Sequence, residues 1–231
     1  MNTNKRTARI AGALFLIAMV TSLAGGIWLE AISGAEDYLS TVSANETQVL
    51  IGVLLELINC IAVVGIAATL LPILKEQSEA LAFGYLGFRV VEATILVVAT
   101  ISPLLLVNLS QEYLAAGATD GAHFEALGTL VMAARAHMAG LWTPIFFSLG
   151  ALLLYSSLYR SKALPRFISV WGLIAVVLLL AWNLAAAFGM SVSTDAGMIF
   201  GLPIILNEIF MGFWLIVKGF EPSAADILSA K

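Results

Sequence analysis

The sequence predicts an all-α, polytopic transmembrane helical bundle of six spans with both termini on the cytoplasmic side. Hydrophobic residues make up 61% and charged residues 11% of the 231 positions, against about 45–50% and about 25% in soluble domains. The apolar residues fall into six long runs that are separated by short polar connections. With six spans, both termini and every second connection lie on the same side of the membrane, and most basic residues fall in these segments. A water-soluble fold of this length could not cover so much apolar surface.

Each apolar run is long enough to cross a bilayer, which takes about 20 residues of helix. The predicted spans cover residues 9–32, 47–74, 80–110, 138–158, 166–190 and 196–218. The first run continues through Leu29, beyond a typical signal-peptide core of about 7–15 residues, so we expect it to be retained as an anchor. Residues 1–220 are therefore predicted to form a single membrane domain, and residues 221–231 a short cytoplasmic tail.

A longer connection between Tyr113 and His137 is rich in Gly and Ala and could hold a surface helix leading into the fourth span. Lys and Arg in short loops are retained in the cytoplasm, which fixes the orientation. Of the other basic residues, Arg135 is assigned to the outer side and Arg89 lies inside a span. Nine of the eleven are assigned to the cytoplasmic side: Lys5, Arg6, Arg9, Lys75, Arg160, Lys162, Arg166, Lys218 and Lys231.

Four ionisable residues fall well inside the predicted spans: Glu56 in the second, Arg89 and Glu92 in the third, and Glu208 in the sixth. Each costs about 2.5–3.5 kcal/mol at the centre of a transmembrane helix on insertion scales. Such residues face the interior of a bundle or a water-filled cavity rather than lipid. We therefore expect these four side chains to point inward.

The spacing of the intramembrane polar residues predicts one polar face on each helix. Glu56 and Asn59 share a face of the second span, as Arg89 and Glu92 do in the third. We expect spans two, three and six to converge and to join their polar side chains in one connected network. The candidate ligand- or proton-binding residues are Glu56, Asn59, Arg89, Glu92, Asn207 and Glu208.

This network supports two functional hypotheses of different classes. One Arg against three Glu leaves a surplus of carboxyl groups, and intramembrane carboxyls serve proton relays and proton-coupled transporters. The first hypothesis is that the network binds or transports a proton-linked small solute or a lipid-like ligand. The alternative is a non-enzymatic sensor or partner subunit of a membrane complex, in which the network is structural and residues 113–137 contact another protein. A wet pocket beside the three Glu favours the first, and a packed, fully paired interior the second.

Other chemistry has little support in the sequence. A convincing pair of nucleophile and base is missing, so an intramembrane enzyme is the least favoured class. Arg89 beside the carboxylates opposes a metal site, and we predict neither a metal nor another cofactor. The single cysteine, Cys60, excludes an internal disulfide, and the chain has no basic stripe for nucleic acid. The lipid bilayer is the partner that the composition implies.

Several stretches together resemble a bacterial family known as domain of unknown function 4386, and the resemblance covers nearly the whole chain. They are Arg9-Ile10-Ala11-Gly12, Asn45-Glu46-Thr47-Gln48, Leu55-Glu56-Leu57-Ile58-Asn59, Gly87-Phe88-Arg89-Val90-Val91-Glu92, Ile101-Ser102-Pro103-Leu104-Leu105, Pro144-Ile145-Phe146-Phe147, Leu206-Asn207-Glu208 and Trp214-Leu215-Ile216-Val217-Lys218-Gly219-Phe220. The resemblance implies a multi-pass protein of the bacterial cytoplasmic membrane. It implies no activity, substrate or catalytic residue.

Overall fold

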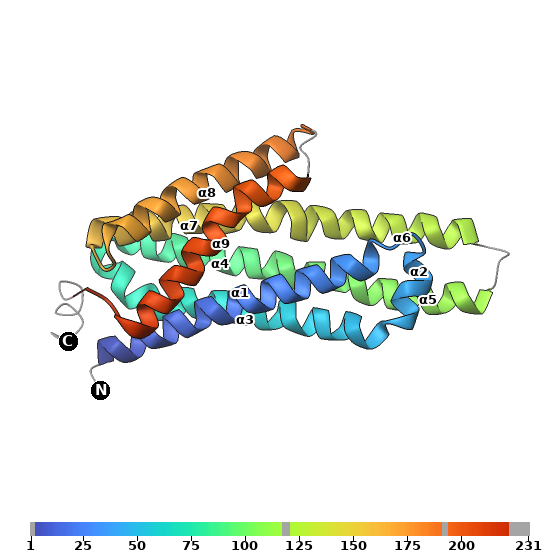
Figure 1. Cartoon of the computed structure of the whole chain (residues 1–231), viewed down its shortest axis with the longest axis horizontal. Coiled ribbons are helices and arrows are strands. Elements are labelled where there is room, and N and C mark those ends of the chain that lie inside the picture. Colours follow the sequence, from blue (N-terminus) through green and yellow to red (C-terminus); the bar gives the residue numbers. More distant parts are fainter. Residues whose placement is uncertain (1–2, 117–120, 191–193, 222–231) are drawn as a thin grey trace.

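The described part of the chain consists of helices joined by short connections (Figure 1). The computed structural model describes residues 3–116, 121–190 and 194–221, and no strand occurs among them. In chain order the elements are α1 (Thr3–Ser33), α2 (Tyr38–Ala44), α3 (Glu46–Gln77), α4 (Glu79–Ala99), α5 (Ile101–Ala116), α6 (Gly121–Arg135), the π-helix η2 (Ala136–Trp142), α7 (Thr143–Ser161), α8 (Arg166–Ala187) and α9 (Thr194–Val217).

Six helical segments of the described chain are long and apolar enough to cross a membrane. They are Lys5–Glu30, Glu46–Gln77, Glu79–Ala116, Gly121–Ser161, Arg166–Ala187 and Ile199–Val217. The predicted all-α fold and its six spans are thus confirmed, and the chain is a multi-pass membrane protein in contact with the lipid bilayer.

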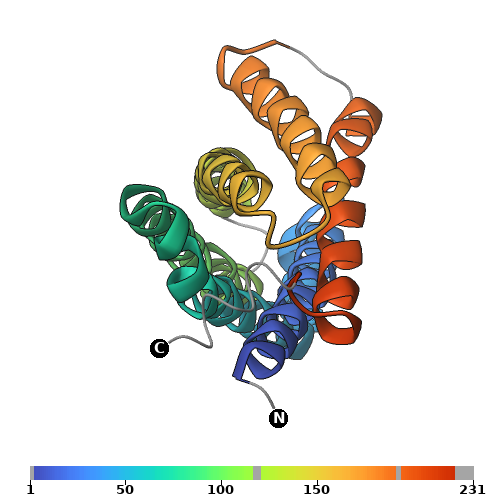
Figure 2. The same cartoon turned by 90° about the vertical axis from the view of Figure 1, so that its left-hand side faces the viewer.

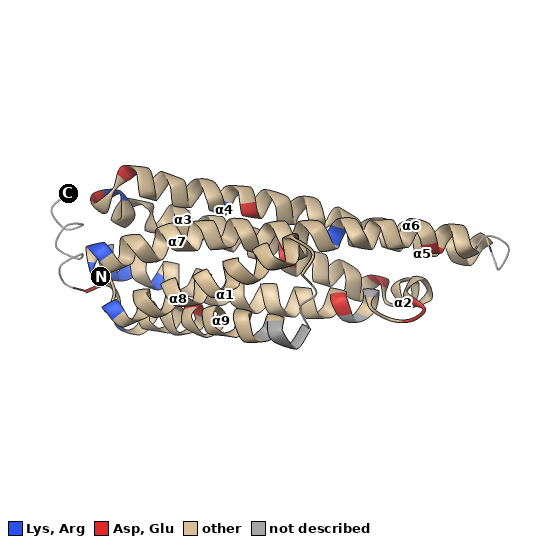
Figure 3. Ribbon diagram, turned by 90° about the horizontal axis from the view of Figure 1, so that it is seen from above, with Lys and Arg blue, Asp and Glu red and all other residues tan. Residues whose placement is uncertain are grey.

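Both ends of the described chain lie at the same end of the bundle, here called the terminal end (Figure 1). The opposite end is called the distal end. Most Lys and Arg residues gather at the terminal end, and Asp and Glu residues are frequent toward the distal end (Figure 3). Assignment of the terminal end to the cytoplasm stays a prediction from the positive-inside rule. Of the predicted tail, only Glu221 falls within the described residues, because residues 222–231 lie outside them.

The third and fourth spans are longer than predicted. Only Thr100 separates α4 from α5, so these helices form one segment from Glu79 to Ala116. Likewise α6, η2 and α7 follow one another without a gap from Gly121 to Ser161. The connection predicted between Tyr113 and His137 therefore consists mainly of the ends of two long helices, and it does hold a helix, α6, that leads into the fourth span with one buried residue, Gly128.

A distal arm is formed by α2, α5 and α6, which extend beyond the other helices (Figure 1). A small apolar core ties this arm to α1 and α3. Its buried members are Leu29, Ile32, Val42, Val49, Leu106 and Val107. The Tyr38 hydroxyl also donates a hydrogen bond of 3.0 Å to the backbone oxygen of Glu125, which links α2 to α6. The arm is thereby packed onto the membrane bundle rather than loosely attached to it.

Helices α1 and α9 cross closely near the terminal end, where each contributes a glycine. A Cβ atom added to Gly12 would lie 2.5 Å from the backbone oxygen of Gly212 and 2.9 Å from Cγ1 of Ile216. Small residues at such crossings let helix backbones approach, which is how transmembrane helices associate in lipid. Farther along, α9 diverges from α1 and accompanies α8 (Figures 1 and 2).

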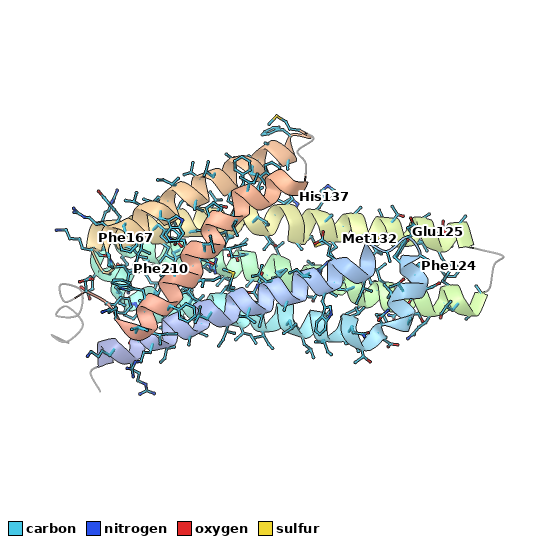
Figure 4. The ribbon with its side chains drawn as sticks, in the orientation of Figure 1. Phe124, Glu125, Met132, His137, Phe167 and Phe210 are labelled. Atoms are coloured by element: carbon cyan, nitrogen blue, oxygen red, sulfur yellow. The ribbon has the colours of Figure 1, made fainter. Side chains whose placement is uncertain are left out.

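Aromatic rings join α8 to α9 at the terminal end. Phe167 packs edge-on against Phe210 with ring centroids 5.7 Å apart, and Trp214 lies 6.3 Å from Phe167. The two phenylalanines lie side by side, whereas Phe124 and Met132 mark the α6 arm at the other end (Figure 4). Edge-to-face pairs of this kind add about 0.5–1.5 kcal/mol to the packing of the rings. They hold α9 beside α8 at the depth where α9 also meets α1.

The close crossing of α1 and α9 leads to a prediction about two glycines. Alanine in place of glycine stabilises a helix interior by about 0.5–1 kcal/mol, as long as the new methyl group has space. Gly87 has no neighbour within 4 Å of an added Cβ, so Gly87→Ala should be neutral or stabilising. Gly12→Ala should destabilise the protein by about 1–3 kcal/mol, because it overpacks the crossing. Unfolding by SDS in mixed micelles measures both, and equal effects would contradict the close crossing.

Candidate functional site

The bundle surrounds a cavity of about 850 Å³ that lies between α1, α3, α4, η2 and α9. This volume is within the range of about 300–1,000 Å³ that is usual for small-molecule sites. Most of the lining is apolar, with side chains such as Met19, Leu96, Phe147 and Ile204. Five of the six candidate residues also line it: Glu56, Asn59, Arg89, Glu92 and Glu208. The cavity is thus an apolar space with a few charged groups.

On the distal side of the cavity, Glu56 of α3 forms an ion pair with Arg135, the last residue of α6. Nη1 of Arg135 donates to Oε2 of Glu56 at 3.2 Å and Nη2 donates to Oε1, so the contact is bidentate. Nη1 also reaches the backbone oxygen of Ala99 at 3.4 Å. Bidentate pairing of this kind gives both strength and a fixed orientation. It ties the third, fourth and second spans together at one point.

The π-helix η2 follows Arg135 directly and connects it to α7. Pro144 has no N–H and therefore cannot continue the regular ladder of helix hydrogen bonds. The hydroxyl of Thr143 donates a hydrogen bond of 2.9 Å to the backbone oxygen of Met138, a carbonyl group within the widened turn. Wide turns of this type are frequent at functional sites. Here the turn lies against the cavity, which is lined by Gly140 and its neighbours in η2.

Deeper in the bundle, Arg89 and Glu92 form a second ion pair within α4. Nη1 of Arg89 lies 2.9 Å from Oε2 of Glu92, and both side chains are less than a tenth exposed. The Arg89 guanidinium also lies over the Phe147 ring, 5.2 Å from its centroid. Gly150 of α7 packs against the same part of α4, where a Cβ added to it would lie 3.3 Å from Cβ of Phe88. The two groups are close enough for an ion pair, but their angles do not meet those of a hydrogen bond. Nε of Arg89 and Oε2 of Glu92 therefore have no hydrogen-bond partner among the described residues.

Glu208 differs from Glu56 and Glu92, the two glutamates of the cavity that are paired with arginine. It lies near the middle of the sixth span and is half-buried in the lining. Among the described residues, none makes an ion pair or hydrogen bond with its carboxyl group. Arg89 is the cation whose charge acts on it, and that guanidinium is already paired with Glu92. Of these three intramembrane carboxyl groups, Glu208 is therefore the one that is open to a further partner, while the exposed Glu30 lies at the mouth.

Asn207 is placed differently from the prediction. Its Oδ1 accepts a hydrogen bond of 2.7 Å from the Tyr155 hydroxyl, and its Nδ2 donates to the backbone oxygen of Ile168 at 3.0 Å. It is fully buried between α7, α8 and α9. Neighbouring positions on a helix point about 100° apart, so Asn207 faces this junction while Glu208 faces the cavity. Asn207 thus anchors the helix that presents Glu208.

Arg135 is the residue of the site that the prediction missed, because it was assigned to the outer connection. The structure places it inside the bundle, so the six candidates do not form one network around Arg89. Instead, two separate Arg–Glu pairs and a lone Glu208 border the cavity. The apolar run from Ala126 to Ala134 could have indicated that the fourth helix begins before Arg135.

Comparison with protein families places the chain in a known group. The model of the family described as domain of unknown function DUF4386 matches residues 10–219. This chain belongs to the DUF4386 family. Comparison with curated proteins and comparison with solved structures each gave no match. The family match includes every residue that lines the cavity of this DUF4386 protein.

The cavity opens between α1, η2 and α8. Lining residues that are exposed mark the opening, and they are Ser22, Leu23, Glu30, Ala136, His137, Gly140 and Ala186. Leu23 falls inside the first span, and Ala186 lies one residue before the end of the fifth. The described residues of this DUF4386 protein contain no group of three or more His, Cys, Asp or Glu that could hold a metal ion.

The two buried asparagines of the spans give a matched test of the junction around Asn207. Asn207→Ala removes the partners of the Tyr155 hydroxyl and of the Ile168 carbonyl, which should cost this DUF4386 protein about 2 kcal/mol. Within the described residues, Asn183 donates one hydrogen bond, to the backbone oxygen of Leu179 one turn earlier, so Asn183→Ala should cost less than about 1 kcal/mol. Unfolding by SDS in mixed micelles measures the loss of stability of each variant. An equal loss in the two variants would show that Asn207 is not an anchor.

Proposed function

We propose that this protein binds a small lipid-like, amphipathic molecule in the cavity, with an apolar part against the aliphatic lining and a polar group beside the Glu/Arg residues. The observation that carries the proposal is the combination of a mainly apolar cavity with an intramembrane carboxyl group, Glu208, that lacks a described partner. An aqueous solute would leave most of this lining without a matching surface. We place this function in the bacterial cytoplasmic membrane.

The position of the mouth supports entry from the bilayer. Leu23 of α1 and Ala186 of α8 are exposed at its edge within the spans. Ser22, Glu30 and His137 provide polar groups at the same opening. An amphipathic molecule in a leaflet presents both kinds of surface at this depth. By entering from the side, the ligand keeps its apolar part in apolar surroundings and its polar group beside polar side chains.

The charges of the lining also support coupling to protons. Inside the cavity, the three carboxyl groups of Glu56, Glu92 and Glu208 face the two guanidinium groups of Arg89 and Arg135, which leaves one negative charge in excess if all five are ionised; Glu30 adds a further carboxyl group at the exposed mouth. A charge without a counter-ion is expensive in the interior of a membrane protein. One of the three carboxyl groups is therefore expected to be neutralised, either by a proton or by the ligand. Binding of the ligand would then be linked to release of that proton.

A structural role in a sensor or partner subunit is the second candidate, and the two ion pairs favour it. The Glu56–Arg135 pair joins α3 to α6, and removal of one member of a buried pair commonly costs about 3–5 kcal/mol. In this alternative the pairs only lock the helices, and the distal arm contacts another protein. The two candidates differ in whether the cavity holds a ligand.

Glycines with open space beside them allow the cavity to be filled without a clash. Gly201 of α9 and Gly140 of η2 line the cavity, and no atom lies within 4 Å of a Cβ added to either. Gly201→Leu and Gly140→Leu should therefore occupy the ligand space while the bundle stays folded. Gly87→Leu is the matched control, because Gly87 is equally open but lies outside the cavity lining.

Native mass spectrometry of protein released from lipid nanodiscs measures what each variant retains. We expect the parent and Gly87→Leu to carry the same discrete small molecule, and Gly201→Leu and Gly140→Leu to lose it at unchanged thermal stability. Retention of that molecule by both cavity-filled variants, or its absence from the parent, would contradict ligand binding in the cavity. The structural alternative would then account for the buried charges.

A further inference from the structure

The accessible charge in the cavity is negative. Glu208 is half-buried and lines the space, whereas Glu92 is less than a tenth exposed and paired with Arg89. Nε of Arg89 is enclosed by protein. A ligand in the cavity therefore meets the Glu208 carboxyl group before it meets a free guanidinium.

Neither arginine of the lining is available to Glu208. Arg135 is held by both oxygens of Glu56 and by the backbone oxygen of Ala99. Ala99 is seven residues beyond Glu92 on α4, which is about 10 Å along the helix axis. Arg89 lies closer, but it is committed to Glu92 and stacked on Phe147. The positive charges of the site are thus already used, and Glu208 is left to an external partner.

Resting on the proposed function, we propose that the ligand is a cationic amphiphile, in which an ammonium-type group pairs with the Glu208 carboxylate and an alkyl chain occupies the apolar lining. The cation supplies the counter-charge that the described residues do not provide. An anionic amphiphile would have to separate one of the two Arg–Glu pairs, and an uncharged one would bind only at the cost of placing a proton on Glu208. Both alternatives are penalised, which is how charged sites select their ligands.

Three probes with the same chain and different head groups test this assignment: decyltrimethylammonium, decanoate and decanol. Each is titrated below its micelle-forming concentration against protein in nanodiscs, and bound probe is counted by native mass spectrometry. Gly201→Leu gives the reference level, because its leucine obstructs the part of the cavity beside α9. Glu208→Gln removes the charge at nearly constant shape. Glu112→Gln is its control, since Glu112 is exposed on α5 and outside the cavity lining.

We expect the parent and Glu112→Gln to bind decyltrimethylammonium at least about tenfold more tightly than decanol or decanoate, as for a closely paired charge. Glu208→Gln should lose this preference while it still binds decanol. Equal binding of all three probes by the parent would overturn the cationic class and leave the proposed cavity function standing. Failure of every probe to exceed the Gly201→Leu level would overturn the proposed function itself. If Glu208→Gln does not fold, the head-group preference of the parent decides.

Discussion

Charged side chains inside a bilayer need partners or a polar cavity, and the Glu56–Arg135 ion pair is the contact through which this protein meets much of that requirement. It joins the second span to the fourth at the residue where α6 gives way to the π-helix η2. It also holds the backbone oxygen of Ala99, where α4 approaches its break at Thr100. The two irregular helices are therefore fixed against α3 at one polar point, and the distal arm continues from the same place.

The remaining helices shape the cavity around this point. At the terminal end, the glycine crossing of α1 with α9 and the aromatic contacts of α8 with α9 close the bundle. Toward the distal end α9 leaves α1, and the space between them is lined by Gly26, Gly201 and Ile205. The helices are thus closely packed at the terminal end, and α1 and α9 separate toward the distal end. Glu208 lies in the cavity between them.

The sequence was sufficient for the spans and for the inward-facing charges, because apolar length and helical spacing are local properties. Glu56 with Asn59 and Arg89 with Glu92 follow from spacing within single helices. The partner of Glu56 could not be found in this way, since Arg135 is 79 positions away in a stretch taken as a connection. Asn207 and Glu208 are adjacent, and only the packing of α7 and α8 reveals that they face different surroundings.

Cysteine accessibility measures whether the charged residues border an open cavity within the membrane. Gly201→Cys lines the cavity, Ala175→Cys lies in the packed core, and Phe213→Cys faces outward from α9. Each is made in a Cys60→Ala background and treated with aminoethyl methanethiosulfonate in nanodiscs, where only a hydrated thiol reacts quickly. We expect Gly201→Cys to be modified many times faster than the other two variants. Equally slow modification of all three variants would contradict an open cavity and favour a closed, structural network.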